Sequence, residues 1–385
     1  MLQSEGTIYY DVAIIGAGPA GCSCALTLKD AGLRVLLLDK ASFPRDKICG
    51  DAIPGRAVKI LRNIAPQFES AFKQFPGKLI TKKTTLYYKG KELTFDWVQE
   101  AYTCTRMEFD NFLFDLVKEN TNTDVLLNSK ADRIIYNEDS ISITLKGTNV
   151  TISTNILIGA DGAQSVVAKQ LTNKILDKNH YVGSVRAYYH NIAECDTDTT
   201  HIYFDKKFLP SYLWVFPLPG NKANVGFGML SSEIASKKAD IKKIFYEFIG
   251  FDPVLKRKFV NANPVSELQG FGLPLGSKTG TLSGKRFMII GDAASLIDPI
   301  SGDGIGNAMI SGKLAAEQAI SCFRNKNFTA DFIGRYDASV LRAIGKELKK
   351  HYHVQQILFK MPFLLDMIFF AGRSKFFKPL IQKAL

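Results

Sequence analysis

The sequence predicts an α/β protein: a mainly parallel sheet with helices, a second domain on a mainly antiparallel sheet, and C-terminal helices. Three observations lead to this fold class. A strand, a glycine-rich turn, a helix and a second strand follow one another in residues 10–40. Two later segments, 156–171 and 284–320, begin with apolar strands that end in glycine and aspartate, and 212–228 holds two consecutive strands. Alternating strands and helices are typical of parallel sheets, whereas strands joined by a short turn are typical of antiparallel sheets.

The size and charge of the chain narrow the function. Its 385 residues are enough for two domains, and 46% hydrophobic with 22% charged residues is ordinary globular composition. The net charge of +12 favours anionic surroundings, such as phosphorylated small molecules or an acidic membrane surface. No nucleic-acid motif is found and the Lys and Arg residues are spread along the chain, so we expect no nucleic-acid partner.

Cysteine usage and the termini predict a cytoplasmic protein without a metal. None of the six cysteines forms a C-x-x-C pair, and His351 and His353 do not share a helix face. The N-terminus lacks the pattern of a secretory signal. The most apolar stretch, 361–372, carries Asp366 and is shorter than the ~18 residues of a membrane span.

The first unit predicts a nucleotide-binding turn. We expect a buried strand over 11–15, a helix over 22–31 and a second strand over 34–38. Gly16, Gly18 and Gly21 form a G-x-G-x-x-G motif between the first strand and the helix. These glycines allow the tight turn, the approach of a pyrophosphate to the backbone and the close packing of helix on strand. The helix N-terminus offers N–H groups to phosphates, and Asp39 stands where an acid accepts ribose hydroxyls.

The segment YLWVFPLPGNKANVGFG, 212–228, predicts a strand, a turn over 217–221 and a returning strand over 223–228. Tyr212, Trp214 and Phe216 alternate with aliphatic residues and therefore share one face of the first strand. Such an aromatic face is either sheet core or one wall of a cavity for a large apolar molecule, and the pattern alone leaves both open.

Three segments together resemble the FAD-dependent oxidoreductases of the p-hydroxybenzoate hydroxylase fold group. They are the glycine unit, ILIGADGAQSVVAKQL and GKRFMIIGDAASLIDPISGDGIGNAMISGKLAAEQAI. The resemblance implies a Rossmann-like domain that binds FAD, with Asp292 holding the ribityl chain. It also implies that the loop with Gly302, Gly304 and Gly306 sets a helix N-terminus against the flavin, where it would stabilise a reduced, anionic flavin. Arg106 in TRMEFDNFLFDLV matches an arginine that lies near the cofactor in these families.

Two further stretches resemble the geranylgeranyl reductases. The pattern Y-x-W-x-F-P followed by G-x-G looks like their substrate-domain signature, and FPRDKICGDAIPGRA resembles a stretch that runs beside the flavin. The chain departs from the hydroxylases, which usually carry Arg where Ala168 stands. It departs from the W-x-W-x-I-P of flavin halogenases at Tyr212 and Phe216.

The resemblance implies an FAD-dependent reductase that transfers hydride from reduced flavin to C=C bonds of a polyprenyl lipid or similar apolar substrate. Protonation of one alkene carbon leaves a tertiary cation that the hydride quenches, so the site needs a dry channel and a proton source. Cys49, Tyr212 or an ordered water are the candidates for that source.

Three alternatives stay open. An FAD-dependent monooxygenase, or less favourably a halogenase, would act on an aromatic or polyene substrate, and a non-catalytic protein would only bind prenyl lipid and retain FAD. Since no second G-x-G-x-x-G unit occurs, the electron donor is either NADPH visiting a shared cleft or a ferredoxin-like protein.

The predicted site residues fall into three groups. Cys49 and Tyr212 are the expected catalytic residues, and Trp214 and Phe216 the expected substrate-lining residues. Arg45 and Lys47 would bind FAD phosphate or an anionic substrate head. The expected cofactor-binding residues are Gly16, Gly18, Pro19, Ala20, Gly21, Asp39, Lys40, Arg45, Lys47, Cys49, Gly50, Arg106, Asp161, Gly291, Asp292, Pro299, Gly302, Gly304, Ile305 and Gly306.

The same patterns predict the domain organisation. We expect a discontinuous FAD-binding domain over 1–80, 101–175 and 270–325, and a substrate domain over 81–100 and 176–269. A C-terminal helical segment over 326–385 mixes basic and aromatic residues and holds no acid after Asp366. It would pack as a lid on the substrate domain or make peripheral contact with an anionic membrane surface on its cytoplasmic side, and both remain open.

Overall fold

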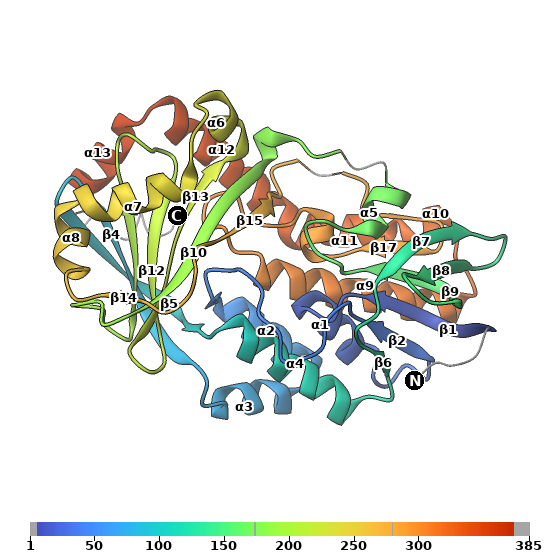
Figure 1. The fold of residues 1–385 in the computed structure, drawn as a ribbon. Coiled ribbons are helices and arrows are strands. Elements are labelled where there is room, and N and C mark those ends of the chain that lie inside the picture. Colours follow the sequence, from blue (N-terminus) through green and yellow to red (C-terminus); the bar gives the residue numbers. More distant parts are fainter. Residues whose placement is uncertain (1–5, 173–174, 279, 373–385) are drawn as a thin grey trace.

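The computed structural model describes residues 6–172, 175–278 and 280–372. Two sheets lie side by side, each with its own helices, and the N-terminal strand and the last described helix lie at opposite ends of the molecule (Figure 1). A mainly parallel sheet, a mainly antiparallel sheet and C-terminal helices confirm the predicted fold class.

The first sheet is built around β1, whose last four residues are buried as expected for a central parallel strand. The strands follow one another across the sheet in the order β16-β17-β9-β1-β2-β6. Outside this order, β8 pairs with β9, and β7 pairs with β8. Parallel pairing joins β1 to β2 and β9, and β9 to β17. The strands are β1 (Gly6–Ile15), β2 (Val35–Leu38), β6 (Asp124–Leu126), β7 (Ala131–Tyr136), β8 (Ile141–Leu145), β9 (Val150–Gly159), β16 (Ser283–Gly284) and β17 (Phe287–Ile289).

The helix after the glycine turn is shorter and earlier than the sequence pattern suggests. It begins at Pro19, because proline suits the first helical turn where its missing N–H is not needed. It ends at Thr27 rather than at Ala31, and the N–H of Leu28 closes its last turn on the carbonyls of Cys24 and Ala25. This helix, α1, packs against α9 (Ile305–Asn325), α4 (Arg106–Asn120) and α2 (Gly55–Ile64).

The second sheet is antiparallel except where β11 pairs β4. Its path runs β14-β10-β13-β12-β11-β4-β5-β3, and β15 also pairs β10. The strands are β3 (Ala52–Ile53), β4 (Leu79–Tyr88), β5 (Lys91–Thr103), β10 (Tyr181–His190), β11 (Thr199–Phe204), β12 (Tyr212–Leu218), β13 (Lys222–Leu230), β14 (Asn263–Pro264) and β15 (Gln269–Pro274).

Helices cover the two faces of the second sheet differently. On one face, α7 and α8 pack against Leu213, Val215 and Phe227 in one core cluster. On the opposite face, α13 covers only one end of the sheet, around Tyr88 and Phe369. The helices are α1 (Pro19–Thr27), α2 (Gly55–Ile64), α3 (Pro66–Gln74), α4 (Arg106–Asn120), α5 (Val166–Leu171), α6 (Ser231–Ser236), α7 (Ile241–Phe251), α8 (Pro253–Lys258), α9 (Ile305–Asn325), α10 (Ala330–Ile333), α11 (Arg335–Val340), α12 (Lys346–Lys360) and α13 (Phe363–Ala371).

The C-terminal segment is helical as far as residue 371, and the expectations for 373–385 lie outside the described residues. Within the described ranges, no single helix has the length and apolarity to cross a membrane. The stretches Ala330–Lys360 and Phe363–Ala371 reach that composition only as a pair, and they bend by 109°.

Candidate cofactor and substrate site

The glycine turn is held against the end of β9. Gly16 has φ +108, and a Cβ at this position would lie 2.3 Å from the carbonyl oxygen of Ala160. A Cβ on Gly21 would lie 1.9 Å from the carbonyl oxygen of Gly16, so both positions require glycine. Asp39, at the end of β2, accepts a hydrogen bond from the N–H of Ala17 at 2.8 Å. The carboxylate therefore lies directly beside the turn, as the motif predicts.

A buried carboxylate orders two arginines behind this turn. Asp110 on α4 accepts two hydrogen bonds from Arg106, at 2.6 and 2.7 Å, and one from Arg45 at 3.0 Å. Burial lowers the pKa of the Arg106 guanidinium, but the charge of Asp110, its hydrogen bonds and the other nearby groups together outweigh burial and raise the pKa. Arg106 is thus a buried ion-pair partner and not a solvated helix start. A Cβ on Gly18 would lie 3.6 Å from Nη2 of Arg45, which places this cation at the glycine turn.

Two predicted cofactor residues from distant parts of the chain meet directly. Nζ of Lys47 lies 2.7 Å from Oδ2 of Asp292, which stands on the turn Gly291–Ala294 after β17. Asp161 behaves differently, because its carboxylate accepts hydrogen bonds from Ser165 and from the N–H of Val166 at the start of α5. Lys40 is exposed at the surface.

Tyr212, Trp214 and Phe216, here called the aromatic face, point to the same side of β12 as predicted. Neighbouring rings have centroids 6.3 Å apart. The Tyr212 hydroxyl donates to the carbonyl of Ser301 at 2.8 Å, in the predicted glycine loop. A Cβ on Gly50 would lie 3.3 Å from Phe216 and 3.5 Å from Nε1 of Trp214. The aromatic face therefore contacts both loops that were expected to border the flavin.

Sequence reasoning missed two polar residues beside the aromatic face, Asn224 and Asp51. Asn224 on β13 accepts from Nε1 of Trp214 at 2.8 Å and donates to the carbonyl of Cys49 at 2.7 Å. It also donates to Oδ2 of Asp51 at 2.8 Å, and Tyr188 donates to the same oxygen at 2.8 Å. The available signals were an asparagine within an apolar strand and an acid directly after Cys-Gly.

Residues 45–51, here called the connecting segment, bridge the two sheets. Its Arg45 and Lys47 pair with Asp110 and Asp292 on the side of the first sheet. Its Asp46 accepts from Arg186 of β10 at 2.9 Å, and its last two residues contact β12 and β13. Seven consecutive residues thus join the glycine turn to the aromatic face.

The glycine loop after β17 is fastened by charged side chains. Asp303 accepts from the N–H of Ile305 at 3.1 Å, in the first turn of α9, and pairs with Arg56 at 2.9 Å. The sequence assigned this turn to the flavin, and the role of the loop stays a prediction. Asn307, one turn into the helix, has a buried Oδ1 without a hydrogen-bond partner among the described residues.

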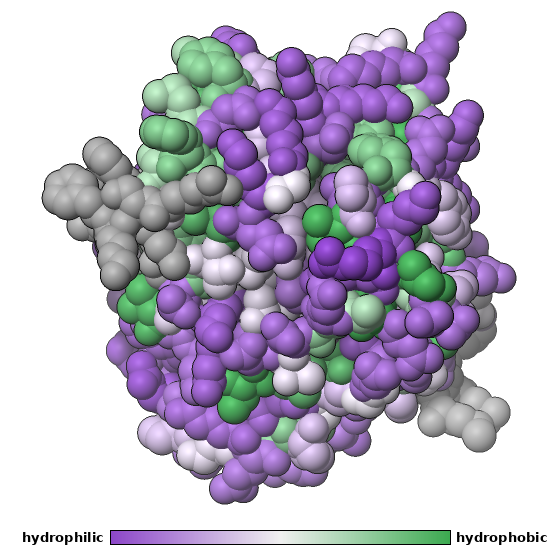
Figure 2. All heavy atoms as spheres, turned by 90° about the vertical axis from the view of Figure 1, so that its left-hand side faces the viewer, coloured by the Kyte–Doolittle hydropathy of each residue, from purple (hydrophilic) through white to green (hydrophobic). Residues whose placement is uncertain are grey.

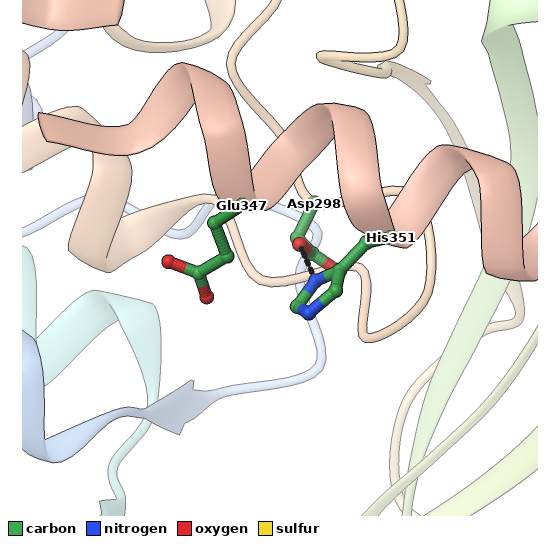
Figure 3. Close-up of side chains that lie close together, drawn as sticks. All are labelled: Asp298, Glu347 and His351. Carbon is green, nitrogen blue, oxygen red and sulfur yellow. Dashed lines mark hydrogen bonds and ion pairs between the residues drawn. The ribbon is translucent and has the colours of Figure 1, made fainter. Parts of the chain in front are cut away.

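Asp298, Glu347 and His351 form an acidic cluster where α12 crosses this loop (Figure 3). Nδ1 of His351 lies 2.5 Å from Oδ2 of Asp298, while the other oxygen of Asp298 accepts from the N–H groups of Ile300 and Ser301. Glu347 pairs with Arg56 at 3.4 Å. These contacts give the cluster a structural role, because they hold α12 against the loop.

The residues present fit a dinucleotide cofactor. The N-terminus of α1 has no side-chain cap, so its N–H groups face the glycine turn where phosphates are bound in such folds. Arg45 adds a positive charge at that turn. Asn307 leaves a buried acceptor for a polar ring group near the second glycine loop.

Comparison with known proteins agrees with this geometry. The FAD binding domain family matches residues 9–238. Menaquinone reductase of Mycobacterium tuberculosis is 31% identical over 320 residues, covering 80% of this chain and 76% of the relative. Digeranylgeranylglycerophospholipid reductase of Methanocella arvoryzae is 27% identical over 357 residues, covering 91% and 88%.

Solved structures share the fold. A geranylgeranyl bacteriochlorophyll reductase-like protein of Thermoplasma acidophilum superposes with a TM-score of 0.79 at 24% identity, covering 91% of this chain and 88% of the other. The flavin-dependent brominase Bmp2 gives 0.79 at 20% identity, covering 98% and 93%. Neither likeness decides the reaction. Together with the family match, the reductase relatives show that this chain belongs to the FAD-binding domain family and is an FAD-dependent oxidoreductase.

Proposed function

We propose that this flavoprotein reduces C=C bonds in the polyprenyl part of a lipid. The observation that carries the proposal is the aromatic face, which meets the connecting segment at Gly50 and the glycine loop at Ser301. An apolar wall at this junction suits a hydrocarbon chain. Digeranylgeranylglycerophospholipid and menaquinone, the substrates named for two relatives, both carry isoprenoid chains, which supports the same substrate class.

In this proposal the first sheet and its loops bind the cofactor, and the second sheet binds the substrate. The glycine turn, Asp39 and Arg45 would hold the pyrophosphate and ribose of FAD, and Lys47 with Asp292 would hold the ribityl chain. We propose the domain organisation that the sequence predicts, with a discontinuous FAD-binding domain over 1–80, 101–175 and 270–325. The substrate domain, over 81–100 and 176–269, would carry the substrate. Bound FAD supplies the hydride once it is reduced.

The chain's own residues would keep the site dry and hold a proton. Trp214 is buried, and the Tyr212 and Phe216 rings on either side of it are half-buried, so they would exclude water from a bound hydrocarbon. Burial raises the pKa of the Cys49 thiol and of the Tyr212 hydroxyl. Both groups therefore keep their protons at neutral pH and remain candidates for protonating the alkene.

The decisive experiment is an anaerobic single turnover. The FAD-loaded protein is reduced with dithionite and mixed with digeranylgeranylglyceryl phospholipid in detergent micelles. We expect flavin reoxidation together with a mass gain of two hydrogens per reduced bond. The fully saturated lipid is the matched control and should leave the flavin reduced. The same experiment is run with a menaquinone as substrate. If the menaquinone gains hydrogens on its quinone ring instead of on its isoprenoid chain, the result would contradict the proposal.

The same experiment separates the alternative reactions. A monooxygenase or halogenase would leave the flavin reduced until oxygen enters and would then give an oxygenated or halogenated product. A protein that only binds prenyl lipid would hold the lipid without any flavin reoxidation. Either result would remove C=C reduction as the function.

The electron donor is part of the proposal. NADPH visiting the cleft as a transient reductant, or a ferredoxin-like protein, would reduce the flavin. Stopped-flow mixing of the oxidised protein with each donor under argon decides between them, because the true donor should bleach the flavin faster than turnover.

We further propose that α13 rests on an anionic membrane surface. Phe363, Met367 and Phe370 on this helix are 53%, 58% and 79% exposed. Figure 2, which faces this end of the molecule, shows apolar side chains gathered at its upper left, beside hydrophilic ones. Apolar side chains with basic neighbours are typical of helices that lie in the membrane interface, and the net charge of +12 adds attraction.

Vesicle binding tests this contact. The protein should co-sediment with vesicles of phosphatidylglycerol more than with phosphatidylcholine, and Phe370→Ser with Met367→Ser should weaken this. Tyr246→Ser is the matched control, because Tyr246 is 56% exposed on α7, which packs on the other face of the second sheet. Equal loss in both variants would contradict the proposed role of α13.

A further inference from the structure

Asp51 is a fully buried acid in an unusual backbone conformation. Its side chain has 0% exposure and its φ is +64, a conformation that non-glycine residues other than Asn and Asp rarely adopt. It follows Gly50, which contacts Trp214 and Phe216 of the aromatic face. A buried carboxyl beside an apolar substrate wall needs a functional or structural reason, because burying an acid costs free energy.

Three groups hydrogen-bond the Asp51 carboxyl. Oδ2 accepts from Asn224 and from Tyr188, each at 2.8 Å, and Oδ1 accepts from the N–H of Arg106 at 3.3 Å. The amide nitrogen of Asn224 and the backbone N–H of Arg106 can only donate. A tyrosine hydroxyl both donates and accepts. When Asp51 is protonated, Tyr188 is therefore the one of these three groups that can accept the Asp51 proton. The hydroxyl hydrogen of Tyr188 can then point toward another group.

Tyr188 lies on the side of the sheet that carries the aromatic face. The registers of β10, β13 and β12 place Tyr188, Asn224 and Phe216 in one row, and Arg186, Gly226 and Trp214 in the next. The Arg186 guanidinium lies 4.2 Å from the centre of the Tyr188 ring. The Tyr188 hydroxyl thus contacts the buried acid from the same side of the sheet as the aromatic face.

Resting on the proposed function, we infer that Asp51 stores the proton for alkene reduction and delivers it through the Tyr188 hydroxyl. The Tyr188 O–H bond breaks as a C–H bond forms at one alkene carbon, and the Asp51 O–H bond breaks as the Tyr188 O–H bond re-forms. The other alkene carbon takes the hydride. The substrate gains two hydrogens, the cofactor loses two electrons, and the Asp51 carboxylate regains its proton from water.

The electrostatics agree with this role. Burial raises the pKa of the Asp51 carboxyl to about 6, against the hydrogen bond from Asn224, the charge of Arg186 and the hydrogen bond from Tyr188. Asp46 raises it slightly, and the neighbouring thiols of Cys49 and Cys104 keep their protons because burial raises their pKa values. Burial also raises the pKa of Tyr188, so the phenol stays neutral and passes a proton on without storing charge.

The first test compares Asp51→Asn, Tyr188→Phe and the control Tyr189→Phe in the anaerobic single turnover between pH 5 and 8. Asparagine tolerates the positive φ of residue 51, and Tyr189 points to the α7 side of the same strand. The wild type and the control should lose rate above pH about 6. The Asp51 and Tyr188 variants should be about 100-fold slower or more, without this pH dependence. Flavin reoxidation by ferricyanide, which protonates no carbon, should be equal in all four proteins.

The second test needs no substrate. Infrared difference spectra of the FAD-loaded protein should show a protonated carboxyl band that titrates near pH 6, is absent in Asp51→Asn and shifts to higher pH in Tyr188→Phe. If the wild type reduces the lipid but Asp51→Asn keeps its rate and pH profile, the inference is overturned. If the band is missing in the wild type, it is overturned as well. If the wild type reduces no prenyl lipid, the proposed function fails instead, and the band alone still decides whether Asp51 holds a proton.

Discussion

Gly226 is the position where a single methyl group should displace the aromatic face. The Trp214 ring lies flat over this glycine, and a Cβ there would be 2.1 Å from Cζ2, 2.5 Å from Cε2 and 2.6 Å from Cη2 of the ring. Since ordinary van der Waals contact begins near 3.4 Å, the ring in Gly226→Ala must retreat by about 1.3 Å, the difference between 3.4 and 2.1 Å, to reach an ordinary contact.

The displacement of the Trp214 ring should lower the free energy of unfolding in two ways. Trp214 is only 8% exposed, so overpacking should cost about 1–3 kcal/mol. The displacement also breaks the 2.8 Å hydrogen bond from Nε1 to Asn224, which adds about 1 kcal/mol. We expect Gly226→Ala to lose about 2–4 kcal/mol of unfolding free energy and to slow turnover, because Asn224 orders the carbonyl of Cys49 and the carboxyl of Asp51.

Gly228→Ala is the matched control in the same strand and on the same face. A Cβ on Gly228 would have its nearest neighbours at 3.3 Å on Val182, 3.8 Å on Ser184 and 3.9 Å on Trp214. Its unfolding free energy should stay within about 0.5 kcal/mol of the wild type. Urea unfolding of both FAD-loaded variants, followed by circular dichroism, makes the comparison. Equal losses in the two variants, or an unchanged Gly226→Ala, would refute the reasoning.

Three further substitutions test the charged groups. Asp110→Asn leaves the buried Arg106 without its carboxylate, and Arg45 with Asp39 alone, and should cost about 3–5 kcal/mol in urea unfolding, whereas Asp115→Asn at a surface pair should cost less than about 1 kcal/mol. Asp39→Ala removes the buried acceptor of the Ala17 N–H beside the glycine turn, so it should weaken FAD binding about 10- to 100-fold in a fluorescence titration and cost the apoprotein about 1–3 kcal/mol in urea unfolding. His351→Asn breaks the hydrogen bond that raises the pKa of His351 above 6.5 and lowers that of Asp298 below 3.8. The melting temperature should therefore differ most from the wild type between pH 4 and 6.5, and the difference should shrink as rising pH deprotonates His351.

Local patterns made the first sheet and the aromatic face predictable. The glycines at 16 and 21 are required by backbone contacts that any strand–turn–helix unit of this type makes, and strand alternation fixed the side on which Tyr212, Trp214 and Phe216 lie. The helix boundaries were less predictable. The sequence pattern begins α1 at Cys22, but the helix begins at Pro19, because proline suits the first helical turn.

The buried polar partners could not be predicted, because each joins residues far apart in sequence. Asp110 is one helical turn from Arg106, but its bond to Arg45 spans 65 positions. The bond from Asn224 to Asp51 spans 173 positions. A single asparagine or aspartate in an apolar stretch has many possible partners, and only the fold selects one. These residues carry most of the electrostatics of the candidate site.

The connecting segment explains why cofactor and substrate chemistry would be coupled in this molecule. Arg45 and Lys47 are held by carboxylates on the side of the first sheet, while Asp46 and Asp51 are held by β10 and β13. Side chains that are neighbours in the connecting segment are therefore bonded to different sheets. The segment cannot shift toward one sheet without breaking its bonds to the other. FAD phosphates at Arg45 would fix the same backbone that presents Gly50 to Trp214. A protein that loses FAD should for this reason also lose order at the aromatic face, even though no residue of that face binds the phosphates.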